Sequence, residues 1–87
     1  MTERKFRIIR AILEVLENLD GGQLVEVTLH AEVNLKVTPT CTLAEFEDAI
    51  QHCDSSGWIL GVMGKFGRGK KWNLSDAGAA ARMEMKS

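Results

Sequence analysis

The chain has 87 residues, with 11 Lys or Arg and 12 Asp or Glu, which gives a formal net charge of −1. Hydrophobic residues make up 45% and charged residues 26%, a composition typical of one soluble globular domain spanning residues 1–87. A large catalytic scaffold is excluded, because a (β/α)₈ barrel needs about 250 residues. The near-zero net charge also excludes a protein that coats nucleic acid by bulk charge alone.

Neither a signal-type N-terminus nor an apolar run of about 18 residues is present, so we expect a cytoplasmic protein without membrane contact. The two cysteines, Cys41 and Cys53, are too few for a disulfide framework or a four-cysteine zinc site. Along one helix axis they would lie about 18 Å apart, whereas a disulfide needs Cα atoms within about 7 Å. We therefore predict two free thiols, which fits a reducing compartment.

A first helix is predicted from about Glu3 to Leu19, with Thr2 as its N-cap. Apolar residues recur in it at three- and four-residue steps: Phe6, Ile9, Leu13 and Leu16, with Ile12 and Leu19 beside them. The run Asp20-Gly21-Gly22 ends the helix, because these residues tolerate positive φ.

The next segment, Leu24 to Val37, fits two structures. Apolar and polar residues alternate along it, and its β-branched content favours a half-buried strand. The same residues also form helical rows, one of which contains Val25, Leu29 and Val33. The local pattern alone favours the strand.

A second helix is predicted after a break at Thr38-Pro39-Thr40. Thr42 and Glu45 have the spacing of a capping box, in which each side chain satisfies a free backbone donor of the other. The helix should run to about Ser56 and end at Gly57, which suits a left-handed C-terminal position.

The last third of the chain predicts a β-hairpin and a closing helix. Trp58 to Val62 is a short apolar strand, Met63 to Gly69 a glycine-rich loop, and Lys70 to Leu74 the return strand. Ser75 is placed to cap a final helix that runs to about Lys86.

This order of elements resembles the winged-helix family of helix-turn-helix domains. The most specific likeness is the run Ser56-Gly57-Trp58-Ile59 before the loop and the run Trp72-Asn73-Leu74-Ser75-Asp76-Ala77-Gly78 after it. It is best matched by small MarR- and PadR-like domains, which suggests a bacterial or phage protein. The resemblance implies an α+β fold, with a three-helix core, a β-hairpin wing and a C-terminal helix. It also favours helix over strand for Leu24–Leu35, with an α/β hairpin fold as the alternative.

The resemblance implies binding to double-stranded DNA, with the helix at residues 42–56 in the major groove and the wing beside it. That helix carries four carboxylates and no Lys or Arg, so its charge opposes entry into a polyanion. The wing has four basic residues and no acidic one between Trp58 and Trp72. We therefore predict a DNA-associated accessory or regulatory module that binds through the wing and the first helix. Its predicted nucleic-acid-binding residues are Lys65, Arg68, Lys70, Lys71, Arg4 and Arg7.

An alternative function is a protein-interaction module that does not bind DNA, because the acidic helix would suit a partner of opposite charge. The residues expected to carry that interaction are Glu47, Asp48, Gln51 and Phe66. The plainer interpretation of both charged clusters is a solvated surface, with Phe66 packed back on the hairpin. Alanines and methionines on the last helix leave open a homodimer through terminal helices, or packing of that helix on the first.

No enzymatic activity, metal or cofactor is predicted. Residues 64–70 match G-x-x-x-x-G-K, but Lys71 replaces the Ser or Thr that would bind magnesium, and a strand follows instead of a helix. His52 and Cys53 are adjacent and point in different directions on a helix, so they form neither a metal site nor a nucleophile pair.

Overall fold

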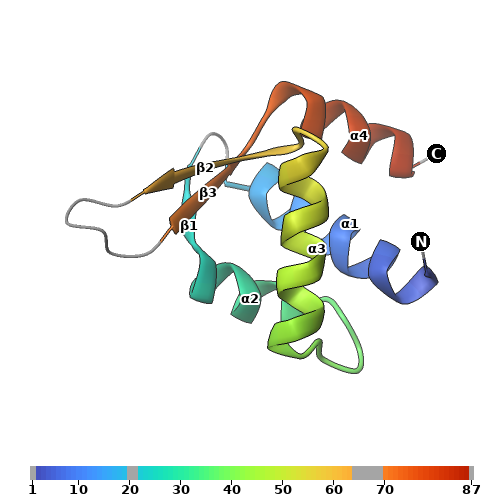
Figure 1. Cartoon of the computed structure of the whole chain (residues 1–87). Helices are drawn as coiled ribbons and strands as arrows, with labels where there is room; N and C mark the ends of the chain where they lie inside the picture. Colours follow the sequence, from blue (N-terminus) through green and yellow to red (C-terminus); the bar gives the residue numbers. More distant parts are fainter. Residues whose placement is uncertain (1, 20–21, 64–69, 87) are drawn as a thin grey trace.

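The computed structural model describes residues 2–19, 22–63 and 70–86, and these form the predicted α+β winged helix (Figure 1). The elements in chain order are α1 (Glu3–Glu17), β1 (Leu24–Val25), α2 (Glu26–Asn34), α3 (Leu43–Ser55), β2 (Ile59–Met63), β3 (Lys70–Leu74) and α4 (Asp76–Lys86). The three strands form one antiparallel sheet in the order β1-β3-β2. In Figure 1 the paired strands β2 and β3 project from the helices to one side.

α1 is the centre of the core, because it packs against α2, α3, α4 and β3. Thr2 caps it as predicted, accepting a hydrogen bond from the Lys5 backbone N–H at 3.1 Å. The buried residues of α1 are Ile8, Ile9, Ala11, Ile12, Leu13, Val15 and Leu16. The prediction that Phe6 belongs to the core was wrong. The buried arc is centred on Ile12, so Phe6 lies at its edge and stays 37% exposed.

The ambiguous segment is a two-residue strand followed by a helix, as the winged-helix resemblance implied. Leu24 pairs with Trp72 and Val25 with Lys71 before the chain turns into α2. Only Leu29 and Val33 of α2 are buried. The alternation of apolar and polar residues that favoured a long strand therefore does not correspond to an alternation of buried and exposed residues.

The capping signals around α3 are confirmed. Both hydrogen bonds of the Thr42–Glu45 capping box are present, and Gly57 adopts φ +75° after the helix ends. Strand β2 begins one residue later than predicted and includes Met63, while β3 has the predicted bounds. The rest of the predicted loop, residues 64–69, lies outside the described residues.

α4 starts where Ser75 was expected to cap it. The Ser75 hydroxyl accepts a hydrogen bond from the Gly78 N–H at 3.0 Å, and the Ser75 N–H donates to the Trp58 carbonyl at 3.0 Å. The first bond caps α4, and the second fastens its start to the chain between α3 and β2. The helix then packs on α1, with Ala81 and Arg82 buried.

Candidate nucleic-acid interface

The described part of the wing carries two exposed lysines at the start of β3. Lys70 and Lys71 make no ion pair with any described residue. The Lys70 Nζ lies 5.0 Å from the centroid of the Trp72 ring, a cation–π distance that leaves the charge at the surface. The other predicted wing residues, Lys65, Phe66 and Arg68, lie outside the described residues and stay predictions.

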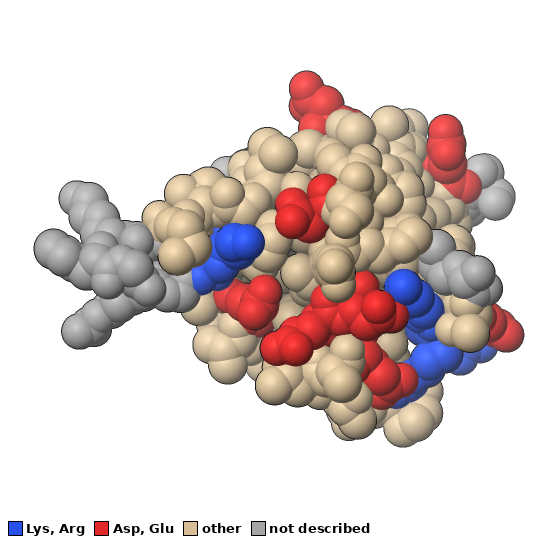
Figure 2. Space-filling model, in the orientation of Figure 1, with Lys and Arg blue, Asp and Glu red and all other residues tan. Residues whose placement is uncertain are grey.

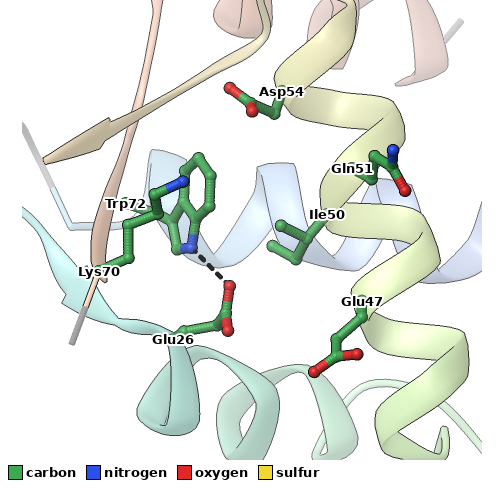
Figure 3. A pocket seen from close by; sticks show the side chains of 7 residues that line it. All are labelled: Glu26, Glu47, Ile50, Gln51, Asp54, Lys70 and Trp72. Carbon is green, nitrogen blue, oxygen red and sulfur yellow. Dashed lines mark hydrogen bonds between the residues drawn. The ribbon is translucent and has the colours of Figure 1, made fainter. Parts of the chain in front are cut away.

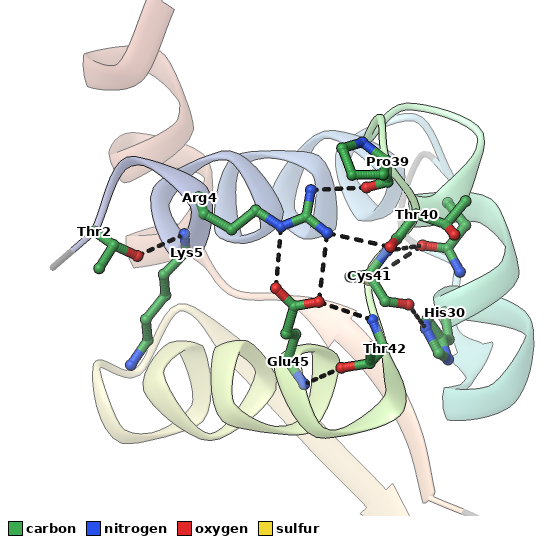
Figure 4. A network of polar contacts seen from close by, with 10 residues as sticks. Thr2, Arg4, Lys5, His30, Pro39, Thr40, Cys41, Thr42 and Glu45 are labelled. Atoms are coloured by element: carbon green, nitrogen blue, oxygen red, sulfur yellow. Dashed lines mark hydrogen bonds and ion pairs between the residues drawn. The ribbon is translucent and has the colours of Figure 1, made fainter.

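Arg4 makes intramolecular contacts that join α1 to the start of α3 (Figure 4). Its guanidinium donates to both carboxylate oxygens of Glu45, at 3.0 and 3.4 Å. It also donates to the carbonyls of Pro39 and Thr40, at 2.7 and 3.1 Å. The hydrogen bond from Arg4 is the main cause that lowers the pKa of Glu45 to about 2. Four contacts to one guanidinium give Arg4 a structural role.

Two further cations of α1 also have acidic partners. Lys5 Nζ lies 3.0 Å from an Asp48 carboxylate oxygen on α3. Arg7 pairs with Glu3 one turn earlier, at 2.9 Å, and both side chains are exposed. The basic cluster predicted on the first helix is therefore largely compensated, and the predicted interaction residue Asp48 faces a cation of its own chain.

The outward side of α3 is acidic, as Figure 2 shows for the face that carries this helix. A hollow of about 380 Å³ lies between α3, the start of α2 and β3 (Figure 3). The residues that line it are Glu26, Glu47, Ile50, Gln51, Asp54, Lys70 and Trp72. Three carboxylates and one ammonium group make this hollow unfavourable for a DNA strand and favourable for a cationic group.

Glu26 and Trp72 were not predicted to lie at this surface. The Trp72 indole Nε1–H donates to a Glu26 carboxylate oxygen at 3.0 Å, although 46 positions separate the two residues. They meet because Leu24 pairs with Trp72, which brings the start of α2 beside β3. The two-residue strand was the one signal that could have predicted this contact.

The described residues contain no group of three His, Cys, Asp or Glu side chains that could hold a metal ion. Both cysteines are free and buried, and desolvation raises the pKa of Cys53 to about 12. Burial also raises the pKa of Cys41, so neither thiol has the character of a nucleophile. Within the described ranges, no helix has the length and apolar composition required to span a membrane.

No protein-family model matches this sequence, and neither does any curated protein. In structure, the chain is similar to a transcriptional regulator from Clostridium thermocellum. That match has 13% identity and a TM-score of 0.79, and it covers 98% of this chain and 84% of the other. It is also similar to a candidate transcriptional regulator from Thermoplasma acidophilum. There the identity is 12% and the TM-score 0.62, with 85% of this chain and 74% of the other covered.

These likenesses show that the chain has the winged-helix fold found in transcriptional regulators. At such low identity they speak to the fold alone, since one fold serves many functions. The narrower resemblance to MarR- and PadR-like domains stays a prediction.

Proposed function

We propose that this protein is a non-catalytic, cytoplasmic regulatory module that contacts double-stranded DNA through its wing. One observation carries the proposal: Lys70 and Lys71 lack acidic partners among the described residues, whereas Arg4, Lys5 and Arg7 have them. Of the basic residues at the start of α1, Arg10 alone makes no ion pair with a described residue. The regulator-like fold supports a role of this kind. Lys65 and Arg68, in the same segment of the sequence, would add two more phosphate contacts.

Wing-led binding has distinct physical properties. Contacts from lysine and arginine to phosphates position a protein on DNA without reading its sequence. Each neutralised phosphate contributes about −0.9 to the slope of log K against log salt concentration. We therefore expect weak, salt-sensitive binding with little sequence preference, and no insertion of the acidic α3 into the major groove.

Fluorescence anisotropy with a labelled duplex, measured from low to moderate salt, tests the proposal. Lys71→Gln should weaken binding several-fold at low salt and reduce the salt slope by about 0.9. Lys5→Gln is the matched control, since it removes the same charge at a site that faces α3. An equal loss in both variants, or no binding by the unmodified chain at low salt, would refute wing-led binding.

A second candidate is a protein-interaction module, favoured by the acidic hollow beside α3. Glu47 and Gln51 line that hollow, so they are better placed than Asp48 for contact with a basic partner. A partner that copurifies with the chain should be lost on Glu47→Lys and kept on Glu32→Lys, a reversal at an exposed site of α2. Recovery that does not differ between the two variants would count against this surface. Phe66, which lies outside the described residues, belongs to this alternative, and a homodimer through terminal helices stays a separate prediction.

A further inference from the structure

A basic groove lies beside α1, lined by different residues from those of the wing and the acidic hollow. It runs between α1 and the segment that joins α2 to α3, and it has a volume of about 330 Å³. Its lining residues are Arg7, Arg10, Ala11, Glu14, Lys36, Val37 and Thr38. A smaller hollow of about 220 Å³ adjoins it and shares Arg7 and Thr38. Three cations from two segments therefore converge on one concavity.

The one carboxylate that lines this groove is compensated twice. Glu14 has one oxygen 3.4 Å from Lys36 Nζ and the other 3.6 Å from an Arg82 guanidinium nitrogen. Arg82 is only 7% exposed, and its Nε has no hydrogen-bond partner among the described residues. Glu14 is therefore held between an exposed and a buried cation, and its negative charge does not offset the other arginines.

The remaining charges leave the groove positive. Arg7 pairs with Glu3 at 2.9 Å, but both side chains are more than half exposed, and such pairs are weak and exchangeable. Arg10 makes no ion pair with any described residue. Two carboxylates, Glu3 and Glu14, stand against four cations, which are Arg7, Arg10, Lys36 and Arg82. Two positive charges are therefore left without a carboxylate to balance them.

We propose that this groove binds a phosphate group. A phosphate carries a charge of about −1.5 to −2 at neutral pH, which matches the two uncompensated cations. Guanidinium groups present parallel N–H donors that fit phosphate oxygens, and Arg7 and Arg10 supply two of them on the same helix wall. Thr38 adds a hydroxyl to the opposite wall. The phosphate belongs either to a free phosphorylated compound or to the backbone of DNA.

Titration with sodium pyrophosphate, followed by NMR of the ¹⁵N-labelled chain, tests the groove. Sodium chloride at equal ionic strength is the reference. Saturable shifts are expected at the amides of residues 7–14 and 36–38. The double variant Arg10→Gln with Lys36→Gln should weaken binding by about tenfold, a change of about 1.4 kcal/mol. Both residues are solvent-accessible, and the spectrum of the variant reports its fold directly. Lys5→Gln removes one cation from α1 at a site that faces α3, outside the groove, and should bind pyrophosphate with unchanged affinity.

A second arm separates the two sources of phosphate. A short duplex is titrated into the variant Lys70→Gln with Lys71→Gln, whose wing charge is reduced. Groove shifts with pyrophosphate and none with duplex assign a free phosphorylated compound, whereas groove shifts with duplex assign the DNA backbone. Shifts in neither arm, shifts that chloride reproduces, or shifts that the groove variant leaves unchanged overturn the proposal. Because wing and groove amides report separately, failure of wing binding to DNA is distinguishable from failure of this site.

Discussion

Replacing Gly78 with alanine tests how α4 is fastened to the rest of the winged helix. Gly78 lies in the first turn of α4, where helix propensity alone favours alanine by about 1 kcal/mol. Packing predicts the opposite sign. An added Cβ would lie 2.0 Å from the Trp58 carbonyl oxygen and 2.7 Å from a Leu74 methyl carbon. The experiment therefore compares the helix propensity of alanine, which favours the variant, with the close approach of the Trp58 carbonyl, which opposes it.

The magnitude follows from what must move. Cβ atoms essentially never lie closer than 3.0 Å to another heavy atom. The distance from the added Cβ to the Trp58 carbonyl oxygen must therefore lengthen from 2.0 Å to at least 3.0 Å, which moves this carbonyl away from α4. That carbonyl accepts the Ser75 N–H at 3.0 Å, so the separation also breaks a bond that fixes the start of α4. Overpacking costs about 1–3 kcal/mol and the lost hydrogen bond about 0.5–1.5 kcal/mol. After the gain in propensity, we expect a net destabilisation of about 2 kcal/mol.

Urea unfolding monitored by circular dichroism measures this difference in the free energy of unfolding. The matched control is Ala80→Gly, an exposed site on the same helix, where propensity alone should destabilise by up to about 1 kcal/mol. If Gly78→Ala stabilises the protein by the amount that Ala80→Gly destabilises it, the close approach to Trp58 has no energetic weight and the reasoning fails.

Three further outcomes are expected. Arg4 holds the pKa of Glu45 at about 2, below its ordinary 4.5, so the stability this pair contributes is present above pH 4.5 and lost as pH falls to about 2. The difference in Tm between the unmodified chain and Glu45→Gln should shrink across that window; a constant difference would contradict the pairing. Trp72→Phe removes the indole donor to Glu26 and should cost about 2 kcal/mol in urea unfolding; a neutral result would show that this bond contributes nothing. Cys53 should react with a thiol reagent only on unfolding, because burial raises its pKa to about 12, and rapid native labelling would refute that.

The ends of the helices could be predicted because short-range chemistry fixes them. Thr2, Thr42 and Ser75 each accept a backbone N–H within the next three residues, so the interaction is contained in the local sequence. Gly57 likewise needs only its own φ of +75° to end α3. Signals of this kind are independent of the tertiary structure.

The segment Leu24–Val37 shows where local patterns stop being informative. In α2 only Leu29 and Val33 are buried, while Val27 and Leu35 are 73% and 81% exposed. Four of the seven apolar residues that alternate from Val25 to Val37 are therefore exposed. A short helix with one buried row has few core residues, so its helical periodicity is weaker than an alternation that arises by chance. The choice between helix and strand therefore depended on the order of the neighbouring elements.

The candidate sites were the least predictable part, because contacts between distant residues build them. Arg4 and Glu45 are 41 positions apart, and Glu26 and Trp72 are 46 apart. Lys36, which follows α2, and Arg82, on α4, meet the same Glu14. The sequence assigns each of these residues a charge, but only packing shows which charges cancel and which stay available.

Those contacts change the meaning of the charge distribution along the chain. The basic start of α1 and the acidic α3 look like two separate binding surfaces in the sequence, yet Arg4 pairs with Glu45 and Lys5 with Asp48. Two of the four carboxylates of α3 therefore help hold this helix against α1. The other two, Glu47 and Asp54, line the hollow beside Trp72. A helix that uses half of its charge to pack and directs the rest outward repels DNA at its own surface, and for this reason we propose the wing rather than α3 for contact with DNA.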